Sequence, residues 1–494
     1  MVIRHFVIVL PVKENDMKLV LFDLPTPRRV HFHPLALSRP IWELRCGLGT
    51  LGDKLAARFG AAPAGCFVPP YMAASYRAKT AWKVNDPTVL AGQEDLLLVN
   101  GRVKAASLRS MGVSPMSPTG VPPVFAVSSL GQQQEKQQRQ QPQQRHGQDA
   151  HATHGQDARD THGQDGHATS EVLAGEDGEV LYARIAAADL AGAPRGDIES
   201  LLAWARQNLP AAAARPETWN YIWELVQANG KCIADEFAAQ GRCGIEGKIE
   251  EPFALRGGRK DVFIAAGAVV HPMVVIDASN GPVVIDEGAE IHPFTRIEGP
   301  CYIGKKTILL GAKCREGNTI GPMCRVGGEV EESIIQGYSN KYHDGFLGHA
   351  YVGEWVNLGA LTTNSDLKND YSNVSVVMDG KTAIDTGSTK VGAMIGDHAR
   401  TSIGTLFNTG AYVGAMSLIV ATGRPLPKFI PSFAWFLDGA VAEGPGKDRL
   451  FEAAKVAMSR RKRAWTTEEE AMWEAIFELT EEEREEAILR GRKN

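Results

Sequence analysis

The segment GYSNKYHDGFLGH, residues 337–349, places two histidines, a lysine and an aspartate among three glycines. Imidazole has an ordinary pKa near 6.5, so a histidine at such a position is suited to take a proton near neutral pH. His343 and His349 are therefore both candidate general bases. The alternative for each is a turn histidine that binds backbone carbonyls, and the residue types alone leave both open.

A second group of charged residues lies in RPIWELRCGLGTLGDK, residues 39–54, which follows an apolar run. A short glycine-rich turn can hold phosphates through its backbone N–H groups, and Arg45 and Lys54 at its ends would balance the charge. Arg39 is a third candidate cation. A G-x-G alone is a weak signal, and Arg39 and Arg45 could instead form ion pairs with Glu43.

Aliphatic residues recur every six positions from about residue 263, where a strand would repeat every two and a helix every 3.6. A six-residue period fits a parallel β-helix with three flat faces, one hexad per face, whose aliphatic residue points into the core. The matching positions are Ile264, Val270, Ile276, Ile285, Ile291, Ile297, Ile303, Leu309, Ile320, Val326, Val352 and Leu358. The period breaks between 327 and 351, and we interpret this break as a loop inserted into the solenoid, with His343 on it.

The remaining chain divides into four parts. Residues 17–240 alternate strand-like runs and helix-compatible stretches, which indicates an α/β domain. A Gln-rich and His-rich insertion at about 129–170 cannot bury enough apolar surface to fold. Its repeated octad could collect Zn²⁺ or Ni²⁺ through five histidines, which are His146, His151, His154, His162 and His167. We expect residues 1–16 to be a leader that is not native, with the domain starting at Met17.

The C-terminal residues 446–494 are helical and amphipathic, and we interpret SRRKRAW within them as a solvated helix face. A net charge of -5 gives no case for nucleic acid or an anionic membrane. Seven cysteines without a C-x-x-C pair indicate reduced thiols and a cytoplasmic protein. No run approaches the roughly 18 apolar residues of a membrane span.

Residues 251–435 resemble the left-handed β-helix acyltransferases. In particular, HDGFLGHAYVGEWVNLGALTTN is similar to the catalytic stretch of the bifunctional UDP-N-acetylglucosamine pyrophosphorylases/glucosamine-1-phosphate N-acetyltransferases. RPIWELRCG and LLLVNG resemble an alternate branch of that family, whose front half is a shortened sugar nucleotidyltransferase. The resemblance implies an α/β nucleotidyltransferase-like domain at 17–240, a left-handed parallel β-helix at 251–435 and a helical tail.

The resemblance also implies roles for individual residues of the β-helix. His343 matches the general base, so His349 would support it by packing. Asn357 matches the asparagine that contacts the amino sugar, and Phe346 stands where the family usually has tyrosine. The remaining implied contacts are Arg315 and Lys341 for the sugar phosphate, and Asn364, Asp397 and Ala415 for acyl-CoA.

In the front half, the resemblance implies that Arg39, Arg45 and Lys54 bind UTP or another nucleoside triphosphate with Mg²⁺. Asn100 in LLLVNG replaces the family's metal-binding carboxylate, so the metal ligands stay unassigned. Three hypotheses follow: a bifunctional enzyme that makes a UDP-N-acetyl amino sugar from acetyl-CoA and UTP, an acyltransferase with an inactive or re-purposed front half, or a non-catalytic solenoid that binds partners. The resemblance further implies a homotrimer that acts on small molecules.

Overall fold

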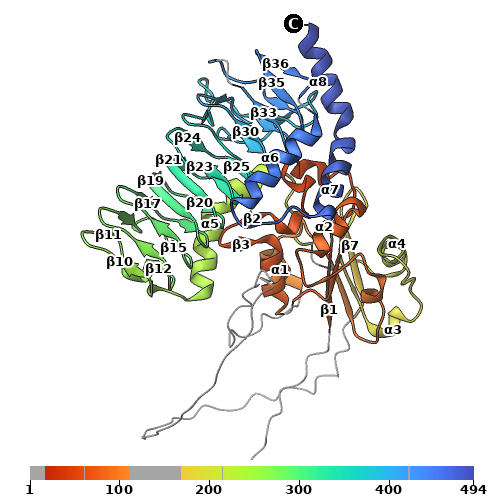
Figure 1. The fold of residues 1–494 in the computed structure, drawn as a ribbon. Coiled ribbons are helices and arrows are strands. Elements are labelled where there is room, and N and C mark those ends of the chain that lie inside the picture. The colour runs from red at the N-terminus through yellow and green to blue at the C-terminus, as the bar shows by residue number, and fades with distance from the viewer. Residues whose placement is uncertain are drawn as a thin grey trace, which may run out of the picture.

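The computed structural model of the chain describes residues 17–60, 62–111, 169–213, 215–420, 423–444 and 446–493. The expected leader 1–16, the five histidines of the octad repeat and nearly all of the expected insertion at 129–170 lie outside these residues. An α/β part packs beside a long tapering solenoid, and the C-terminal helices run along the junction between them (Figure 1).

The N-terminal part is built on a six-stranded sheet with the order β5-β4-β1-β6-β8-β7. Strands β5, β4, β1 and β6 run parallel to one another, β8 runs antiparallel to β6, and β7 runs antiparallel to β8. The strands are β1 (Lys18–Phe22), β4 (Gly65–Phe67), β5 (Lys83–Val84), β6 (Leu96–Asn100), β7 (Glu171–Ala174) and β8 (Val180–Ile185), and a separate hairpin joins β2 (Arg45–Cys46) and β3 (Gly49–Thr50).

Helices cover both faces of this sheet because its central strands are apolar on both sides, as parallel strands usually are. Leu19 and Leu21 of β1 face one core, and Val20 and Phe22 face the other. The helices that cover the sheet are α1 (Leu51–Phe59), α2 (Ala73–Arg77), α3 (Ala187–Leu190) and α4 (Ile198–Asn208), whereas α5 (Ile222–Gln240) packs against the solenoid. The alternation predicted from the sequence is therefore confirmed as an α/β domain.

The C-terminal part is a parallel β-helix of the left-handed class predicted from the six-residue period. Its first face contains β9 (Gly244–Ile245), β12 (Val262–Ile264), β15 (Val283–Ile285), β18 (Cys301–Ile303), β20 (Asn318–Ile320), β22 (Ile334–Gly337), β25 (Tyr351–Glu354), β29 (Met394–Ile395), β32 (Tyr412–Val413) and β34 (Phe429–Ile430). These strands pair in parallel and in order along the axis.

The second and third faces are joined where β19 and β21 bend around a corner. The second face contains β10 (Lys248–Ile249), β13 (Val269–Val270), β16 (Glu290–Ile291), β19 (Ile308–Cys314), β21 (Arg325–Glu331), β23 (Asn340–Lys341), β30 (Arg400–Thr401), β33 (Leu418–Ile419) and β35 (Trp435–Leu437), with the closing strand β36 (Ala440–Ala442). The third face contains β11 (Ala254–Arg256), β14 (Val275–Asp277), β17 (Arg296–Glu298), the ends of β19 and β21, β24 (Phe346–Gly348), β26 (Thr363–Asn364) and β31 (Leu406–Phe407).

The aliphatic residues of the six-residue period form one continuous core along the solenoid axis. Ile264, Ile285, Ile303 and Ile320 are each fully buried in it. Each coil adds apolar area that only its neighbours can cover, so the stack is stable as a whole and not coil by coil.

The interpretation of residues 327–351 as an inserted loop is wrong. This segment is a regular coil, with β22, β23 and β24 in register with the coils before and after it. Its interior positions are Ile335, Lys341 and Leu347, which keep the six-residue spacing. The period was missed because a lysine occupies an interior position where the other coils have an aliphatic residue.

The actual interruption of the solenoid comes one coil later. Strand β25 pairs directly with β29, and β26 pairs with β31, so the chain between β26 and β29 leaves the coil path. That segment contains an antiparallel hairpin of β27 (Ser375–Val377) and β28 (Ala383–Asp385).

The helical tail is confirmed and consists of α6 (Lys447–Ser459), α7 (Thr467–Leu479) and α8 (Glu481–Lys493). Thr466 caps α7 by accepting a hydrogen bond from the backbone N–H of Glu469. Met472, Trp473 and Ile476 of α7 are buried in the same core as the N-terminal sheet. The tail therefore fastens the α/β domain to the end of the β-helix. In the described part of the chain, no helix has the length and apolar character needed to cross a membrane.

Candidate functional site

Lys341 lies inside the β-helix at the corner between β23 and β24. It takes the interior position that Val326 holds one coil earlier, and its side chain is 4% exposed. Its Nζ donates to the carbonyls of Gly327 and His343 at 2.9 and 2.8 Å, and burial lowers the pKa of Lys341 to about 8. The expected contact of Lys341 with a sugar phosphate does not agree with this placement. Its ammonium lies in the interior of the β-helix and is bonded to backbone carbonyls of the turn.

His343 projects from the outside of the same corner and is exposed. Its ring lies edge-on to Tyr342, with 5.0 Å between ring centroids. Gly345, two residues later, has a φ of +129°, and a Cβ there would run into the carbonyl of Thr362 in the next coil. The corner is therefore rigid, and it presents His343 to solvent from a backbone that the interior lysine fixes.

Arg315 and Phe346 lie on the adjoining third face of the solenoid. Phe346 is the register partner of Glu329, one coil earlier. The Nη1 atom of Arg315 lies 2.6 Å from the Oε2 atom of Glu331 and 3.9 Å from Glu329. The side chain of Arg315 is 42% exposed, so the guanidinium remains accessible to an anion beside the corner.

Asn357 is exposed on the coil that follows His343. Its side-chain oxygen accepts a hydrogen bond of 3.2 Å from Asn340, and Asn340 in turn accepts one of 2.9 Å from Arg461. Arg463 donates to the hydroxyl of Tyr338 at 2.7 Å. The interpretation of SRRKRAW as a solvated helix face is therefore wrong in part, because its last arginines connect α6 to α7 and bring cations to the candidate site.

His349 is buried between two carboxylates. Its Nδ1 lies 2.8 Å from Asp366 and its Nε2 lies 2.9 Å from Glu332. Burial alone would lower the pKa of His349, but the hydrogen bonds to Asp366 and Glu332 outweigh it and raise the pKa to about 9. His349 is thus held as an imidazolium that links adjacent coils and is not free to accept a proton.

The three residues expected to contact acyl-CoA are all inside the molecule. Asn364 is 1% exposed and bonds both the N–H and the carbonyl of Gly348, each at 2.9 Å. Asp397 is 3% exposed and pairs with Arg39, and Ala415 lies in the core shared with the N-terminal domain. The acyl-CoA assignments therefore do not agree with the structure, because no side-chain surface is left for a ligand.

The three cations expected to bind nucleotide also have internal partners. Arg39 is buried against Asp397 and Glu354 of the β-helix. The Nε atom of Arg45 donates to the carbonyl of Gln336 at 2.9 Å, and Lys54 pairs with Glu236 of α5. Arg39 and Arg45 thus join the two domains, Lys54 pairs within the α/β domain, and this placement does not agree with their expected role at a triphosphate.

The glycine-rich turn between β2 and β3 is likewise occupied by protein groups. The N–H of Gly47 donates to Asn229 at 2.7 Å, and the N–H of Leu48 donates to Glu236 at 2.9 Å. Thr319 of β20 donates to the carbonyl of Gly47 at 2.7 Å. The turn therefore docks on α5 and the solenoid and does not offer free N–H groups to a phosphate.

The carboxyl ends of β1 and β6 carry polar residues, of which the sequence analysis named Asn100 but missed Asp23. This edge is where open parallel sheets bind ligands. Asp23 follows β1 and accepts from Arg29 at 3.1 Å and from the N–H of Ile41 at 2.9 Å. The Asn100 amide donates to Glu179 at 3.1 Å, and Glu179 also pairs with Arg102. The signal that could have located Asp23 is its position directly after an apolar strand.

These residues do not fit a Mg²⁺ site in the arrangement seen here. Mg²⁺ requires oxygen ligands in near-octahedral geometry. The carboxylates of Asp23, Asp177 and Glu179 are each paired with an arginine, and the carbonyl oxygen of Asn100 accepts the N–H of Arg102. No step of a nucleotidyl reaction is therefore derived through a metal.

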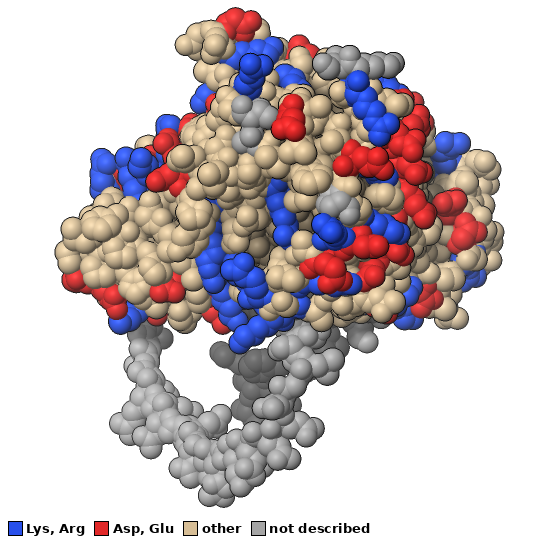
Figure 2. All heavy atoms as spheres, turned by 45° about the horizontal axis from the view of Figure 1, so that its top comes forward, with Lys and Arg blue, Asp and Glu red and all other residues tan. Residues whose placement is uncertain are grey.

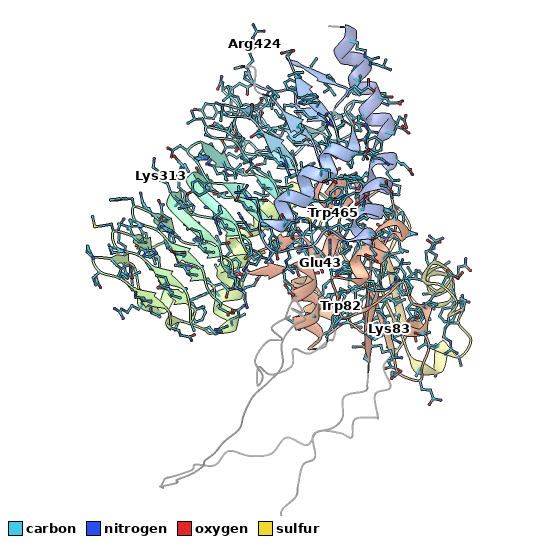
Figure 3. All side chains as sticks on the ribbon, viewed as in Figure 1. Glu43, Trp82, Lys83, Lys313, Arg424 and Trp465 are labelled. Carbon is cyan, nitrogen blue, oxygen red and sulfur yellow. The ribbon has the colours of Figure 1, made fainter. Side chains whose placement is uncertain are left out.

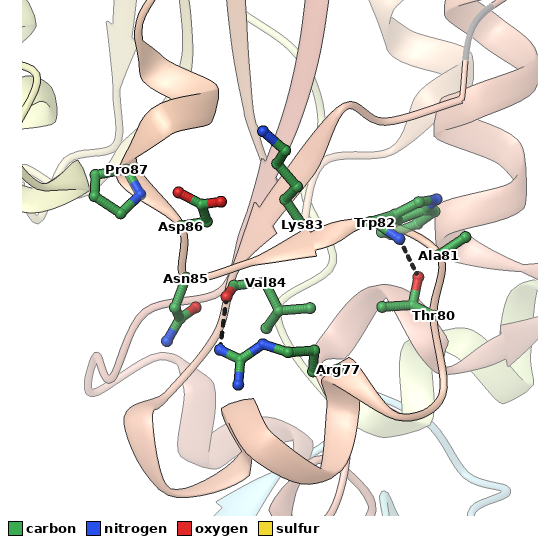
Figure 4. Close-up of a pocket in the computed structure, with 9 residues that line it drawn as sticks. All are labelled: Arg77, Thr80, Ala81, Trp82, Lys83, Val84, Asn85, Asp86 and Pro87. Carbon is green, nitrogen blue, oxygen red and sulfur yellow. Dashed lines mark hydrogen bonds between the residues drawn. The ribbon is translucent and has the colours of Figure 1, made fainter.

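Two cavities lie in the N-terminal domain. One of about 300 Å³ is lined by Leu24, Phe67, Asn85 and Asp197, beside the carboxyl ends of β1 and β4. The other, of about 600 Å³, is lined by residues between α2 and η5 (Pro87–Leu90), including the Trp82–Asn85 segment (Figure 4). All the residues that line this larger cavity belong to the α/β domain, so it is not part of the corner around His343, and Figure 3 shows Trp82 and Lys83 away from Lys313 of the solenoid.

Charge is distributed unevenly over the surface. On the face drawn in Figure 2, Lys and Arg gather below the centre, while Asp and Glu are densest toward the right. Both signs are present, in agreement with the small net charge of -5. This distribution is suited to small charged ligands at local sites.

The fold defines a two-domain protein in which an α/β domain precedes a left-handed parallel β-helix, and the β-helix presents His343 at an exposed corner. Residues 19–111 match the family model described as sugar nucleotidyl transferase. A bifunctional sugar-1-phosphate nucleotidylyltransferase/acetyltransferase of Sulfurisphaera tokodaii is 38% identical over 151 residues, which are 28% of this chain and 35% of that protein. A bifunctional protein GlmU of Jannaschia sp. is 31% identical over 229 residues, which are 45% of this chain and 43% of that protein.

The match thus spans about a third of the length of the Sulfurisphaera relative. Among solved structures, a UDP-N-acetylglucosamine acyltransferase of Francisella novicida has 13% sequence identity and a TM-score of 0.26, covering 48% of this chain and 86% of that one.

Proposed function

We propose that the chain is a bifunctional enzyme of sugar-nucleotide synthesis. Its β-helix would transfer an acetyl group from acetyl-CoA to an amino-sugar-1-phosphate, and its N-terminal domain would transfer a uridylyl group from UTP, which gives a UDP-N-acetylglucosamine-type product. The observation that carries the proposal is the exposed imidazole of His343, held on a rigid solenoid corner. The match of residues 19–111 to sugar nucleotidyl transferases supports the second activity.

In the acetyl transfer, the amine nitrogen of the sugar attacks the thioester carbonyl of acetyl-CoA, and His343 takes the proton that the amine loses. A C–N bond forms, the C–S bond breaks, and the CoA sulfur leaves with the proton returned by His343. General base catalysis of this kind contributes roughly 10²–10⁴ in rate, and alignment of the two substrates supplies most of the rest.

The groups around the corner suit a phosphorylated amino sugar. Arg315 offers an accessible guanidinium on one side, and Arg461 brings a second cation to the Asn340–Asn357 pair on the other. The amide of Asn357 can bind a sugar hydroxyl, and Phe346 offers an apolar surface to the ring. Arg461 therefore replaces Lys341 in the proposed set of substrate contacts.

A second candidate function, an acyltransferase with a re-purposed front half, is favoured by one specific observation. The expected nucleotide-binding cations and the carboxylates at the sheet edge are all paired within the protein. Binding of UTP would require several of these pairs to exchange partners. In that case, the α/β domain would act mainly as a support for the β-helix.

The test of the acetyl transfer is the His343→Asn variant. We expect acetyl-CoA turnover with glucosamine-1-phosphate to fall by about 10²–10⁴, with an unchanged melting temperature because the imidazole is exposed. His146→Asn, the same change outside the solenoid, serves as the matched control. If His343→Asn keeps full turnover, the catalytic role fails, and a solenoid that only binds partners becomes the better explanation.

The two candidate functions are separated by the second half-reaction. The bifunctional enzyme should release pyrophosphate from UTP and N-acetylglucosamine-1-phosphate in the presence of Mg²⁺. If no pyrophosphate is released with several sugar phosphates while acetyl transfer is retained, the acyltransferase-only alternative is correct. We further propose that the chain forms a homotrimer, which light scattering on the purified chain would test. We also propose a cytoplasmic location, because the seven free cysteines agree with a reducing compartment.

A further inference from the structure

A group of metal-binding residues lies on the second face of the β-helix, among its first coils and remote in sequence from His343. His271 follows β13, and Glu290 and His292 flank Ile291 of β16. Ile291 points into the core, so its two neighbours both point outward, as alternation along a strand requires. The ligand atoms of His271, Glu290 and His292 lie within 4.8 Å of one another.

The distances within this group match those between ligands on one small cation. The Nε2 atom of His271 lies 3.0 Å from the Oε1 atom of Glu290, and the Nε2 atom of His292 lies 3.3 Å from the same oxygen. Zinc–ligand bonds of about 2.0–2.2 Å in tetrahedral geometry put neighbouring ligand atoms about 3.3 Å apart. The two imidazole rings are also close, with 5.0 Å between their centroids.

A fourth residue already orients one of the histidines. The Oε2 atom of Glu250 lies 2.9 Å from the Nδ1 atom of His271, while the other oxygen of Glu250 is held by Lys248 at 2.6 Å. A carboxylate that binds the far nitrogen of a ligating histidine fixes its tautomer and directs the near nitrogen to the metal. This contact leaves the Nε2 atom of His271 as the ligand.

The backbone holds these residues in place. The N–H of His271 donates to the carbonyl of Ile291 at 2.9 Å, and the N–H of His292 donates to the carbonyl of Leu309 at 2.9 Å. His271 and His292 thus occupy equivalent positions in consecutive coils. The side chains of His271, His292 and Glu290 are 25, 35 and 39% exposed, so an ion can enter from solvent and keep a water ligand.

We propose that His271, Glu290 and His292 form a binding site for a divalent transition metal, with Zn²⁺ as the best fit. Two imidazoles and one carboxylate favour Zn²⁺ over Mg²⁺ or Ca²⁺, which prefer oxygen ligands. The ion would connect consecutive coils near the open N-terminal end of the solenoid, where fewer neighbouring coils cover the core. Its role is to stabilise this end of the fold, and it is independent of the proposed acetyl transfer.

The test must first remove the octad histidines, which can bind zinc by themselves. We therefore take as reference the full chain with His146, His151, His154, His162 and His167 all changed to Ala. After equilibration with zinc and dialysis, the reference should retain about one zinc per chain, and the His271→Ala/His292→Ala variant should retain none. Zinc should raise the melting temperature of the reference and leave that of the variant unchanged.

Two further variants sharpen the result. Glu250→Gln should keep one site but weaken zinc affinity by about 10–100-fold, because it removes only the orienting carboxylate. His343→Ala, which changes an exposed histidine without metal-binding neighbours among the described residues, should retain zinc as the reference does. Circular dichroism checks that each variant is folded. Equal zinc content in the reference and the His271→Ala/His292→Ala variant would overturn the proposal.

Discussion

At the scale of single residues, two histidines six positions apart have opposite properties. His343 is exposed to solvent, whereas His349 is enclosed by Asp366 and Glu332. The difference comes from the turn of the solenoid, which points one side chain outward and places the other between two coils. The pattern of residues that first suggested two equivalent bases thus separates into one proposed base and one structural cation.

The pairing of His349 predicts a specific dependence of stability on pH. The pKa of His349 in the folded protein, about 9, lies above its ordinary 6.5, so its contribution is complete below about pH 6.5 and is lost as the pH rises through 9. The pKa values of Asp366 and Glu332 are lowered, so their contribution is lost only at acidic pH. The ion pairs should therefore stabilise the fold fully at about pH 5–6.5 and lose their contribution progressively toward pH 9.

We expect His349→Gln to lose roughly 2–3 kcal/mol of unfolding free energy at pH 6.5, and the difference from the parent protein to shrink toward pH 9.5. Denaturant unfolding at several pH values measures this. Taking the difference cancels the opposite contribution of Lys341, whose lowered pKa makes stability rise with pH above about 8. A difference that stays constant between pH 6.5 and 9.5 would show that His349 is not held as an imidazolium.

At the scale of elements, the corner between β23 and β24 depends on a lysine in an interior position. Lys341 donates to the carbonyls of Gly327 and His343 on either side of the turn. Burial of an ammonium costs folding free energy. We therefore infer that Lys341 positions the turn and does not stabilise the fold.

Lys341→Met should therefore affect catalysis more than stability. Met fills a similar volume and removes the cost of burying an ammonium, which offsets the loss of its hydrogen bonds, so the unfolding free energy should change by about 1 kcal/mol or less. The corner loses its two internal hydrogen bonds, and kcat for acetyl transfer should fall about tenfold while KM for acetyl-CoA stays constant. Val326→Ile, at the equivalent interior position one coil earlier, is the control and should leave kcat within about twofold. A matching fall in kcat for both variants would assign the effect to general packing.

At the scale of the whole molecule, buried charges join the α/β domain to the β-helix. Arg39 lies against Asp397 and Glu354, and both Arg39 and Asp397 are less than 10% exposed. Tyr351 and Gln336 of the solenoid contact Arg45, and Trp473 of the tail is buried beside the N-terminal sheet. We therefore expect the two domains to unfold cooperatively, because loss of either domain would expose buried charged and apolar groups of the other.

This interface predicts strong coupling between Arg39 and Asp397. Arg39→Met should cost roughly 3–5 kcal/mol of unfolding free energy, because it leaves a buried carboxylate without its main cation. The double variant Arg39→Met/Asp397→Asn should recover much of that loss, which a double-mutant cycle in denaturant would measure. Lys381→Met removes an exposed pair with Glu486 and should leave stability nearly unchanged. Additive effects of the two interface substitutions would contradict direct pairing.

The sequence by itself determined the repeating architecture, because a six-residue period of aliphatic residues has few structural solutions. It also singled out the segment with His343, although as a loop, and it predicted the helical tail. The pattern of aliphatic residues is interrupted at Lys341. In the sequence, a lysine at an interior position cannot be distinguished from an exposed lysine, so the coil was not recognised. That single residue turned a regular coil into an expected loop, while the true interruption after β26 went unnoticed.

Only the tertiary structure decided which charged residues are free to meet a ligand. Arg39, Lys54 and Asp397 have the types and spacing of binding residues, but their partners come from segments far away in the chain. Likewise, His271 and His292 are 21 positions apart and become neighbours only because successive coils stack in register. Ionic partners and metal ligands depend on distances across the fold, and local sequence patterns carry no information about those distances.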